Sequence, residues 1–213
     1  MGIVVSLDAR RQGRPLRDGA RIERARTAFY FDLADPGTYL AAERVDRLFD
    51  GIAWLPASLN ALRGATSRVM VLGDEAAAAR ASALRMPLVW PERHPAPRLA
   101  AMRAAAYAAE HGRGAAFVLA ASRLAFCGGF DLDDPEVLAE AAAAAGVGLR
   151  ECLRAAGDVA RDAEIEDEAR RLAAAGADRL PVVRVGRLLF AGEHQVAAAS
   201  AAWRDPAPLR RRA

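Results

Sequence analysis

The pattern of hydrophobic and polar positions changes from strand-like to helix-like and back between residues 27 and 56. The segment TAFYFDL (27–33) is rich in aromatic residues and predicts a strand. Four apolar residues then recur at helical spacing from Ala41 to Phe49, which predicts an amphipathic helix. The segment IAWLP (52–56) predicts a second strand, which its final proline ends. A strand, a helix and a strand in this order form a βαβ unit, whose strands pair in parallel.

The middle of the chain has a different pattern. From about Asp74 to Gly176 the sequence predicts mostly helix, interrupted by short stretches that are rich in proline and glycine. Strand signals then return in PVVRV (181–185) and LLF (188–190), which flank a short hairpin turn, and GEHQVAAASAAW predicts a closing helix. Because neither β part is stable alone, we expect both to share one sheet. The predicted fold class is α/β, with the order βαβ…ββα and a large all-helical insertion.

These patterns divide the chain into segments of different charge. Residues 27–73 and 177–203 form the predicted sheet domain, and residues 74–176 form the inserted helical domain. Residues 1–26 are a basic arm with a net charge of +4, which we expect to be partly disordered, and residues 204–213 are a tail of +3. The remaining body is therefore mildly acidic, since the whole chain carries +3. We read the basic ends as solvated, and predict neither a nucleic-acid nor a membrane partner.

Composition narrows the chemistry further. The chain has 213 residues and is 53% hydrophobic, but much of this is alanine, which favours helix. All 30 basic residues are arginine, so the chain has no lysine for a Schiff base or a phosphate-binding P-loop. The sequence also contains no Gly-x-Ser-x-Gly motif and no clear dinucleotide fingerprint.

The two cysteines do not form a recognisable motif. Cys127 and Cys152 fit neither a Cys-x-x-Cys redox pair nor a zinc knuckle, so we predict that both are unpaired, inert thiols. His94 and His111 show no spacing typical of metal ligands, and we predict no metal site. We find no signal peptide and no apolar run of transmembrane length, so we expect a cytoplasmic protein.

The turn before the first predicted helix is the main candidate site. Asp35 is a favoured N-cap residue and Pro36 is favoured at the first helical position. Asp134 begins another predicted helix in the same way, so a plain structural cap is one interpretation of Asp35. A catalytic or ligand-binding role, supported by the hydroxyl of Thr38, is the other. In either case we expect the carboxylate to accept backbone N–H bonds from Gly37 or Thr38 and to be ionised at neutral pH.

Three segments in this order resemble a known family. They are FYFDLADPGTYLAAERV (29–45), MPLVWPERHPAPRLAAMRAA (86–105) and RLPVVRVGRLLFAGEHQV (179–196). The chain resembles the DsbA-like branch of the thioredoxin superfamily over about residues 27–203. The likeness is greater to 2-hydroxychromene-2-carboxylate isomerases and kappa-class glutathione transferases. The resemblance implies a thioredoxin-like sheet with a large all-helical insertion.

The resemblance also implies a site. Asp35 stands where the family has Cys in oxidoreductases or Ser in isomerases and transferases, and Thr38 stands at the second redox position. Pro181 matches the family's cis-proline, which we expect opposite the Asp35 turn. The family places the glutathione γ-glutamyl group near residues 192–194, although Glu193 also has a structural reason at a helix start. The expected ligand-binding residues are Pro36, Gly37, Trp90, Leu180, Pro181, Val182, Gly192, Glu193 and His194.

The function that the resemblance implies is an isomerase or glutathione transferase acting on a small organic substrate. Its cofactor would be glutathione or another low-molecular-weight thiol, and related transferases form dimers, so a homodimer is one expected state. One alternative is a thioredoxin-fold binding protein that has lost its chemistry. A DsbA-type oxidoreductase is an alternative by fold only, because the turn has no sulfur. A carboxylate at this position would repel a thiolate, so we expect weak glutathione binding.

Overall fold

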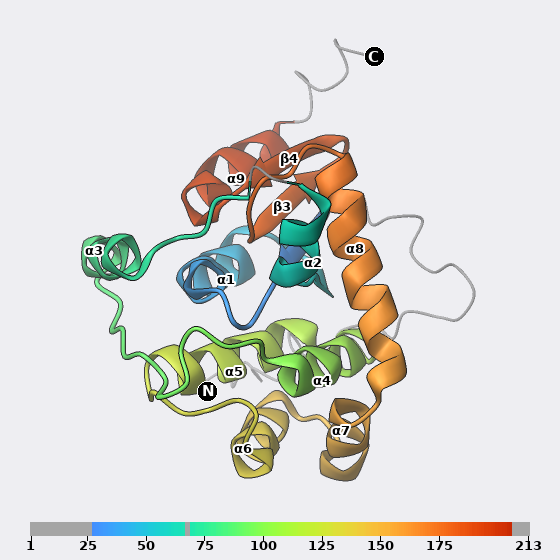
Figure 1. The fold of residues 1–213 in the computed structure, drawn as a ribbon. Coiled ribbons are helices and arrows are strands. Elements are labelled where there is room, and N and C mark those ends of the chain that lie inside the picture. The colour runs from blue at the N-terminus through green and yellow to red at the C-terminus, as the bar shows by residue number, and fades with distance from the viewer. Residues whose placement is uncertain (1–26, 67–68, 206–213) are drawn as a thin grey trace, which may run out of the picture.

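The computed structural model describes residues 27–66 and 69–205 (Figure 1). The predicted arm 1–26 and most of the predicted tail lie outside the described residues. The elements are β1 (Thr27–Phe31), α1 (Pro36–Leu48), β2 (Ala53–Pro56), α2 (Leu59–Ala65), α3 (Asp74–Leu84), α4 (Leu99–Glu110), α5 (Gly114–Phe126), α6 (Pro135–Ala145), α7 (Leu149–Ala156), η2 (Val159–Arg161), α8 (Asp162–Ala174), β3 (Val182–Val185), β4 (Leu188–Ala191), η3 (Glu193–Gln195) and α9 (Val196–Arg204).

The strands form one mixed sheet in the order β2-β1-β3-β4. β1 pairs in parallel with β2, and it pairs in antiparallel fashion with β3, which continues through a hairpin to β4. The predicted βαβ unit, hairpin and helical insertion are therefore confirmed. The first strand is two residues shorter than predicted, because the chain turns after Phe31 into the segment that precedes α1.

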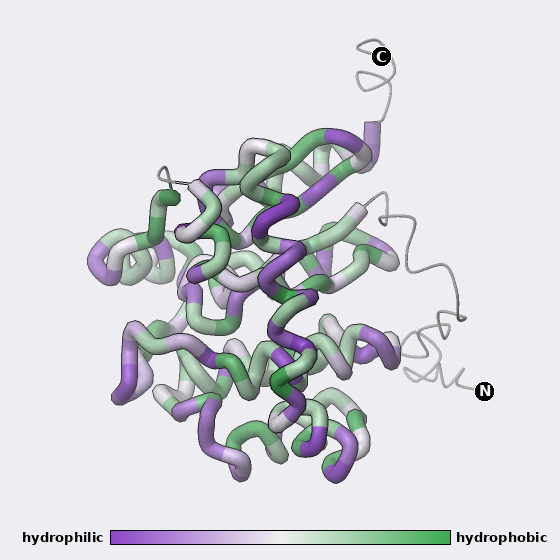
Figure 2. Tube along the Cα trace, turned by 45° about the vertical axis from the view of Figure 1, so that its right-hand side comes forward, coloured by the Kyte–Doolittle hydropathy of each residue, from purple (hydrophilic) through white to green (hydrophobic). Residues whose placement is uncertain are grey.

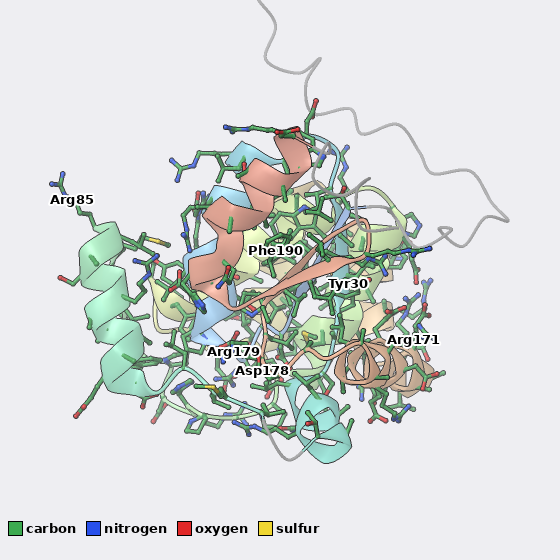
Figure 3. All side chains as sticks on the ribbon, turned by 90° about the horizontal axis from the view of Figure 1, so that it is seen from above. Tyr30, Arg85, Arg171, Asp178, Arg179 and Phe190 are labelled. Atoms are coloured by element: carbon green, nitrogen blue, oxygen red, sulfur yellow. The ribbon has the colours of Figure 1, made fainter. Side chains whose placement is uncertain are left out.

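Alternation along β1 assigns its side chains to two cores. Phe29 and Phe31 lie in the larger core, with residues of α1, α4, α5 and α9. Ala28 and Tyr30 point to the opposite face, which α2 and α8 cover. Figure 1 shows α8 running along one side of the sheet, and Figure 3 shows Tyr30 and Arg171 on this side. Both faces of this internal strand are thus buried.

The inserted helices pack closely because their buried residues are small. The buried face of α4 consists of alanines and one methionine, Ala101, Met102, Ala104, Ala105 and Ala108. Figure 1 shows α4 to α7 gathered below the sheet, and in Figure 2 hydrophobic and hydrophilic positions alternate along the helices. The last helix of the predicted insertion, α8, packs instead on α2 and the second face of the sheet. The insertion and the sheet domain therefore share packed surfaces.

One helix was not predicted from the sequence. α2 follows β2 directly, and the hydroxyl of Ser58 caps it by accepting the N–H of Ala61 at 3.2 Å. Leu59 and Leu62 bury this short helix against α8. Ser58 was the available sequence signal, since serine is a favoured cap.

No helix within the described ranges has both the length and the apolar character that a membrane span requires. The same residues contain no group of three or more His, Cys, Asp or Glu side chains that could hold a metal ion.

A buried ionic cluster joins α1, α3 and η3. The Glu193 carboxylate accepts Arg44 Nη2 at 2.5 Å and Arg80 Nε at 2.7 Å. Arg44 Nη2 also donates to the Glu193 carbonyl oxygen at 2.7 Å. α3 stands at the side of the molecule in Figure 1, and Figure 3 shows Arg85 at its end pointing away from the body. The Arg80 contact therefore ties an outlying helix to the sheet domain.

We predict that the two arginines contribute unequally to stability. Replacing Arg44 with Gln leaves the buried Glu193 carboxylate with less compensation and costs about 3 kcal/mol. Replacing Arg80 with Gln costs about 1 kcal/mol or less, because a third of its side chain is exposed. Urea denaturation of the two variants and the wild type measures both values. Equal losses of unfolding free energy in the two variants would contradict the expectation that the more buried arginine contributes more to stability.

Candidate functional site

The candidate site is built where β1 passes into α1. Asp35 caps α1, because its Oδ1 accepts the N–H of Gly37 at 3.1 Å. Its carbonyl oxygen accepts the N–H of Thr38 at 3.0 Å, and the Thr38 hydroxyl accepts the N–H of Asp32 at 3.2 Å. These bonds close a tight turn in which Asp35 is only 2% exposed. The predicted N-cap is confirmed.

The expected ionisation of Asp35 at neutral pH is wrong. Burial raises the pKa of its carboxyl to about 7, and the nearby charge of Asp32 adds to this rise. The N–H bond from Gly37 lowers the pKa but does not offset desolvation. The second oxygen, Oδ2, is buried without a hydrogen-bond partner among the described residues. At neutral pH the group is therefore divided between its acid and carboxylate forms.

Asp32 is a second buried carboxyl that the sequence analysis did not select. Its Oδ1 accepts the N–H of Ala34 at 2.8 Å, and its Oδ2 accepts the N–H of Leu59 at 2.7 Å. Burial raises the pKa of Asp32, while these two bonds and the charge of Arg63 lower it. Both carboxylate oxygens accept hydrogen bonds from backbone N–H groups, so Asp32 fixes the turn and the start of α2. Its only sequence signal was an acidic residue directly after a buried strand.

Pro181 lies against the start of α1, as predicted. The Leu180–Pro181 bond is cis. A Cβ placed on Gly37 would come within 3.1 Å of the Pro181 ring, so only glycine allows this approach without a shift. The Pro181 carbonyl oxygen accepts the N–H of Gly192 at 2.7 Å, which connects the turn to the last helix.

A pocket of about 270 Å³ opens beside this turn. Its walls come from the α1 turn, the start of α2, the segments on both sides of α3, and the first turn of α8. The ionisable side chains that line it are Asp32, Asp35, Arg63, Asp74, His94, Arg98, Asp162 and Glu166. Leu59, Leu72, Leu99, Met102 and Ile165 supply apolar surface. The pocket thus combines an apolar wall with a few polar groups, as small-molecule sites do.

The structure brings only part of the predicted site together at this pocket. Of the predicted residues, Asp35 and Pro36 line it. Gly37 and Thr38 lie behind them in the first turn of α1. Trp90 is not in the wall but stacks on His94, with ring centroids 4.5 Å apart.

The predicted residues around the hairpin do not line the pocket. Leu180 and Val182 are buried in the core under α2 and α8. Glu193 is occupied by its two arginines, and His194 is exposed beside Gly192. None of these four residues, and neither Pro181 nor Gly192, lines the pocket.

The two cysteines are both free, as predicted. Cys152 is buried, and burial raises the pKa of its thiol. Cys127 Sγ lies 3.0 Å from the hydroxyl of Tyr39, which also donates to the Pro87 carbonyl oxygen at 2.6 Å. Neither sulfur lies at the Asp35 turn.

Comparison with solved structures identifies the fold. A 2-hydroxychromene-2-carboxylate isomerase matches with a TM-score of 0.71 and 17% identity, over 87% of this chain and 96% of the isomerase. A probable DsbA oxidoreductase from Streptomyces coelicolor matches with a TM-score of 0.63 and 21% identity, over 83% of this chain and 87% of the oxidoreductase. No protein-family model and no curated protein sequence matches the chain.

The chain therefore has the DsbA-like thioredoxin fold, an α/β fold with a mixed four-stranded sheet and a helical insertion between its strands. This fold agrees with the resemblance seen in the sequence. Within it, the turn at the start of α1 carries a buried carboxyl group and no sulfur.

We predict that Asp35 makes stability depend on pH. The pKa of Asp35 is raised from about 3.9 in the unfolded chain. The favourable contribution of this carboxyl to the free energy of unfolding is therefore fully present below about pH 3.9. It is lost as the pH rises through about 7. Asp35→Asn keeps a capping oxygen but does not titrate. Relative to this variant, the free energy of unfolding of wild type should fall by on the order of 3 kcal/mol between pH 5 and pH 8.

Chemical denaturation of both proteins at the two pH values measures this difference. Asp134→Asn is the matched control, because Asp134 caps α6 from an exposed position and accepts the N–H of Glu136 at 2.8 Å. If the difference between wild type and Asp35→Asn is the same at both pH values, the assigned pKa is wrong.

Proposed function

We propose that this protein is an enzyme that transfers protons to and from a small organic substrate, with Asp35 as the acid–base group. The reaction class is an isomerisation or elimination that begins with removal of a proton from carbon. A carboxylate removes the proton, and the same group in its acid form can return one. No redox partner is needed, since proton transfer leaves the oxidation state of the substrate unchanged.

One observation supports this proposal most strongly, the raised pKa of Asp35 at the wall of a pocket. General acid–base catalysis is most effective when the pKa of the group lies near the working pH. Burial gives Asp35 a pKa of about 7, whereas a solvated aspartate would be a weak base. Strongly perturbed carboxyl groups in pockets are enriched at active sites.

The α1 turn does not fit a glutathione thiolate. In the resembled family this turn offers the free N–H groups and the dipole of the helix to sulfur. Here the Asp35 carboxyl accepts the N–H of Gly37 at 3.1 Å and occupies the same position. Its Oδ2 would lie 3.0 Å from a Cβ on Gly37, so the carboxyl covers the first turn of the helix. We therefore assign proton transfer to the carboxyl and no step to a thiol.

The pocket has one arginine that is suited to hold an anionic substrate. Most of its other charged groups already have partners: Arg98 pairs with Asp131, Asp162 with Arg103, and Glu166 with Arg170. Arg63 is exposed on α2, and no ion pair joins it to another described residue. A substrate carboxylate bound to Arg63 would place the remaining part of a small molecule in the pocket.

We predict that the protein accelerates the ring opening of 5-nitrobenzisoxazole, a small bicyclic carbon acid. A base removes the ring C–H proton, the electron pair forms a nitrile, and the N–O bond breaks to give a phenolate. The rate should rise with pH through a midpoint near 7, because only the Asp35 carboxylate is a base. Asp35→Asn should lower the rate at least about 100-fold, and absorbance of the phenolate measures it.

Asp134→Asn serves again as the control, with an expected rate equal to wild type. A rate that Asp35→Asn does not change would contradict the proposal. The absence of turnover together with saturable binding of small carboxylates would instead favour a binding protein.

A further prediction concerns glutathione. At pH 8 the Asp35 carboxyl is mostly ionised, and it competes with a thiolate for the same donors and repels it. Wild type should therefore bind glutathione more weakly than Asp35→Ser, which keeps a capping oxygen without a charge. Calorimetry on both proteins decides this. Equal affinity, or tighter binding by wild type, would show that the carboxyl assists the thiol.

A further inference from the structure

His94 is held rigidly in the wall of the same pocket. Its ring stacks on Trp90 with centroids 4.5 Å apart and an interplanar angle of 27°. The edge of Phe126 meets the ring from another direction, with centroids 6.1 Å apart at 80°. The side chain is 9% exposed. Two aromatic contacts therefore fix the plane of the imidazole.

One ring nitrogen is held by a carboxylate. Nε2 of His94 lies 3.3 Å from Oδ1 of Asp74, the first residue of α3. A carboxylate in this position accepts the ring N–H and orients the imidazole. No hydrogen bond joins Nδ1 to another residue of the described segments. That nitrogen is left to exchange a proton with a bound molecule.

The charges of the pocket leave His94 and Asp35 as its acid–base groups. The other charged or titratable groups that line the pocket are Asp32, Asp35, Arg63, Asp74, Arg98, Asp162 and Glu166. Asp32 is committed to two backbone N–H groups, and Arg98, Asp162 and Glu166 form ion pairs. Arginine does not exchange protons near neutral pH, and Asp74 is engaged with the imidazole itself.

We infer that His94, which lines the same pocket as Asp35, is the second proton-transferring residue of this site, with Asp74 and Trp90 as positioning residues. This inference rests on the proposed function. The Asp35 carboxylate takes a proton from substrate carbon, and the C–H electron pair forms a new π bond. The His94 imidazolium gives a proton to the atom on which negative charge develops. Water then removes the proton from Asp35 and returns one to His94, so that one proton leaves and one arrives in each turnover.

Two related compounds separate the roles of the two residues. The phenolate released from 5-nitrobenzisoxazole is stabilised by its nitro group and leaves without a proton. Unsubstituted benzisoxazole releases a more basic phenolate, which benefits from an acid. His94→Gln should therefore slow the reaction of benzisoxazole at least about tenfold and change that of the nitro compound less than about twofold. His111→Gln is the control, since His111 does not line the pocket and contacts Tyr107 on α4 through its ring and through Nδ1.

Asp74→Asn tests the positioning role and leaves the His94 ring in place. It should slow the reaction of benzisoxazole at least about threefold and leave that of the nitro compound unchanged, because a carboxylate no longer orients the imidazole. If His94→Gln lowers both rates equally while its unfolding curve matches that of wild type, or lowers neither, the inference is wrong. If His94→Gln does not fold, an equal effect of Asp74→Asn on the two compounds, or no effect on either, overturns the inference. No wild-type turnover of either compound would overturn the proposed function and the inference with it, whereas turnover that depends on Asp35 alone overturns only the inference.

Discussion

The burial of the Asp35 carboxyl at the start of α1 is the interaction on which this site depends. Both faces of β1 are covered, so the chain leaves the sheet within the interior and must satisfy its backbone there. Asp35 and Asp32 provide the acceptors for this turn. The same burial that makes these hydrogen bonds necessary also opposes ionisation of Asp35. Asp35 is therefore both the structural cap of α1 and a group with a pKa near 7, and burial is the cause of both properties.

The close approach of Pro181 to Gly37 completes the enclosure of Asp35. A larger side chain at Gly37 would meet both the Asp35 carboxyl and the proline ring. A helix start favours an anion, which lowers the pKa of an acid placed there. In this chain the anion would be the Asp35 carboxylate. The cost of its desolvation is larger than its stabilisation by the helix, so the pKa of Asp35 rises. The fold is the same, but the chemistry that we propose for this helix start is proton transfer by a carboxyl group.

The sequence predicted much of the fold and less of the site. The aromatic content of the first strand, the cap at Asp35 and the hairpin were local signals, and each was found. The ionisation of Asp35 was mispredicted, because capping bonds are visible in a sequence whereas burial depends on tertiary packing. For the same reason the walls of the pocket were missed: residues 71–74 and 162–166 are distant in sequence and line the same pocket only in the folded chain. Trp90 was selected for the pocket, and it contacts His94 instead.

The most direct test of this account is the pKa of Asp35 itself. Carbon-13 NMR of protein labelled at the aspartate carboxyl carbons follows each group through a pH titration, and Asp35→Asn identifies the signal that belongs to Asp35. The account predicts a midpoint near 7 for this signal. A midpoint at or below about 4, the value for a solvated aspartate, would show that the helix start stabilises the carboxylate and would contradict a role for Asp35 as the acid–base group.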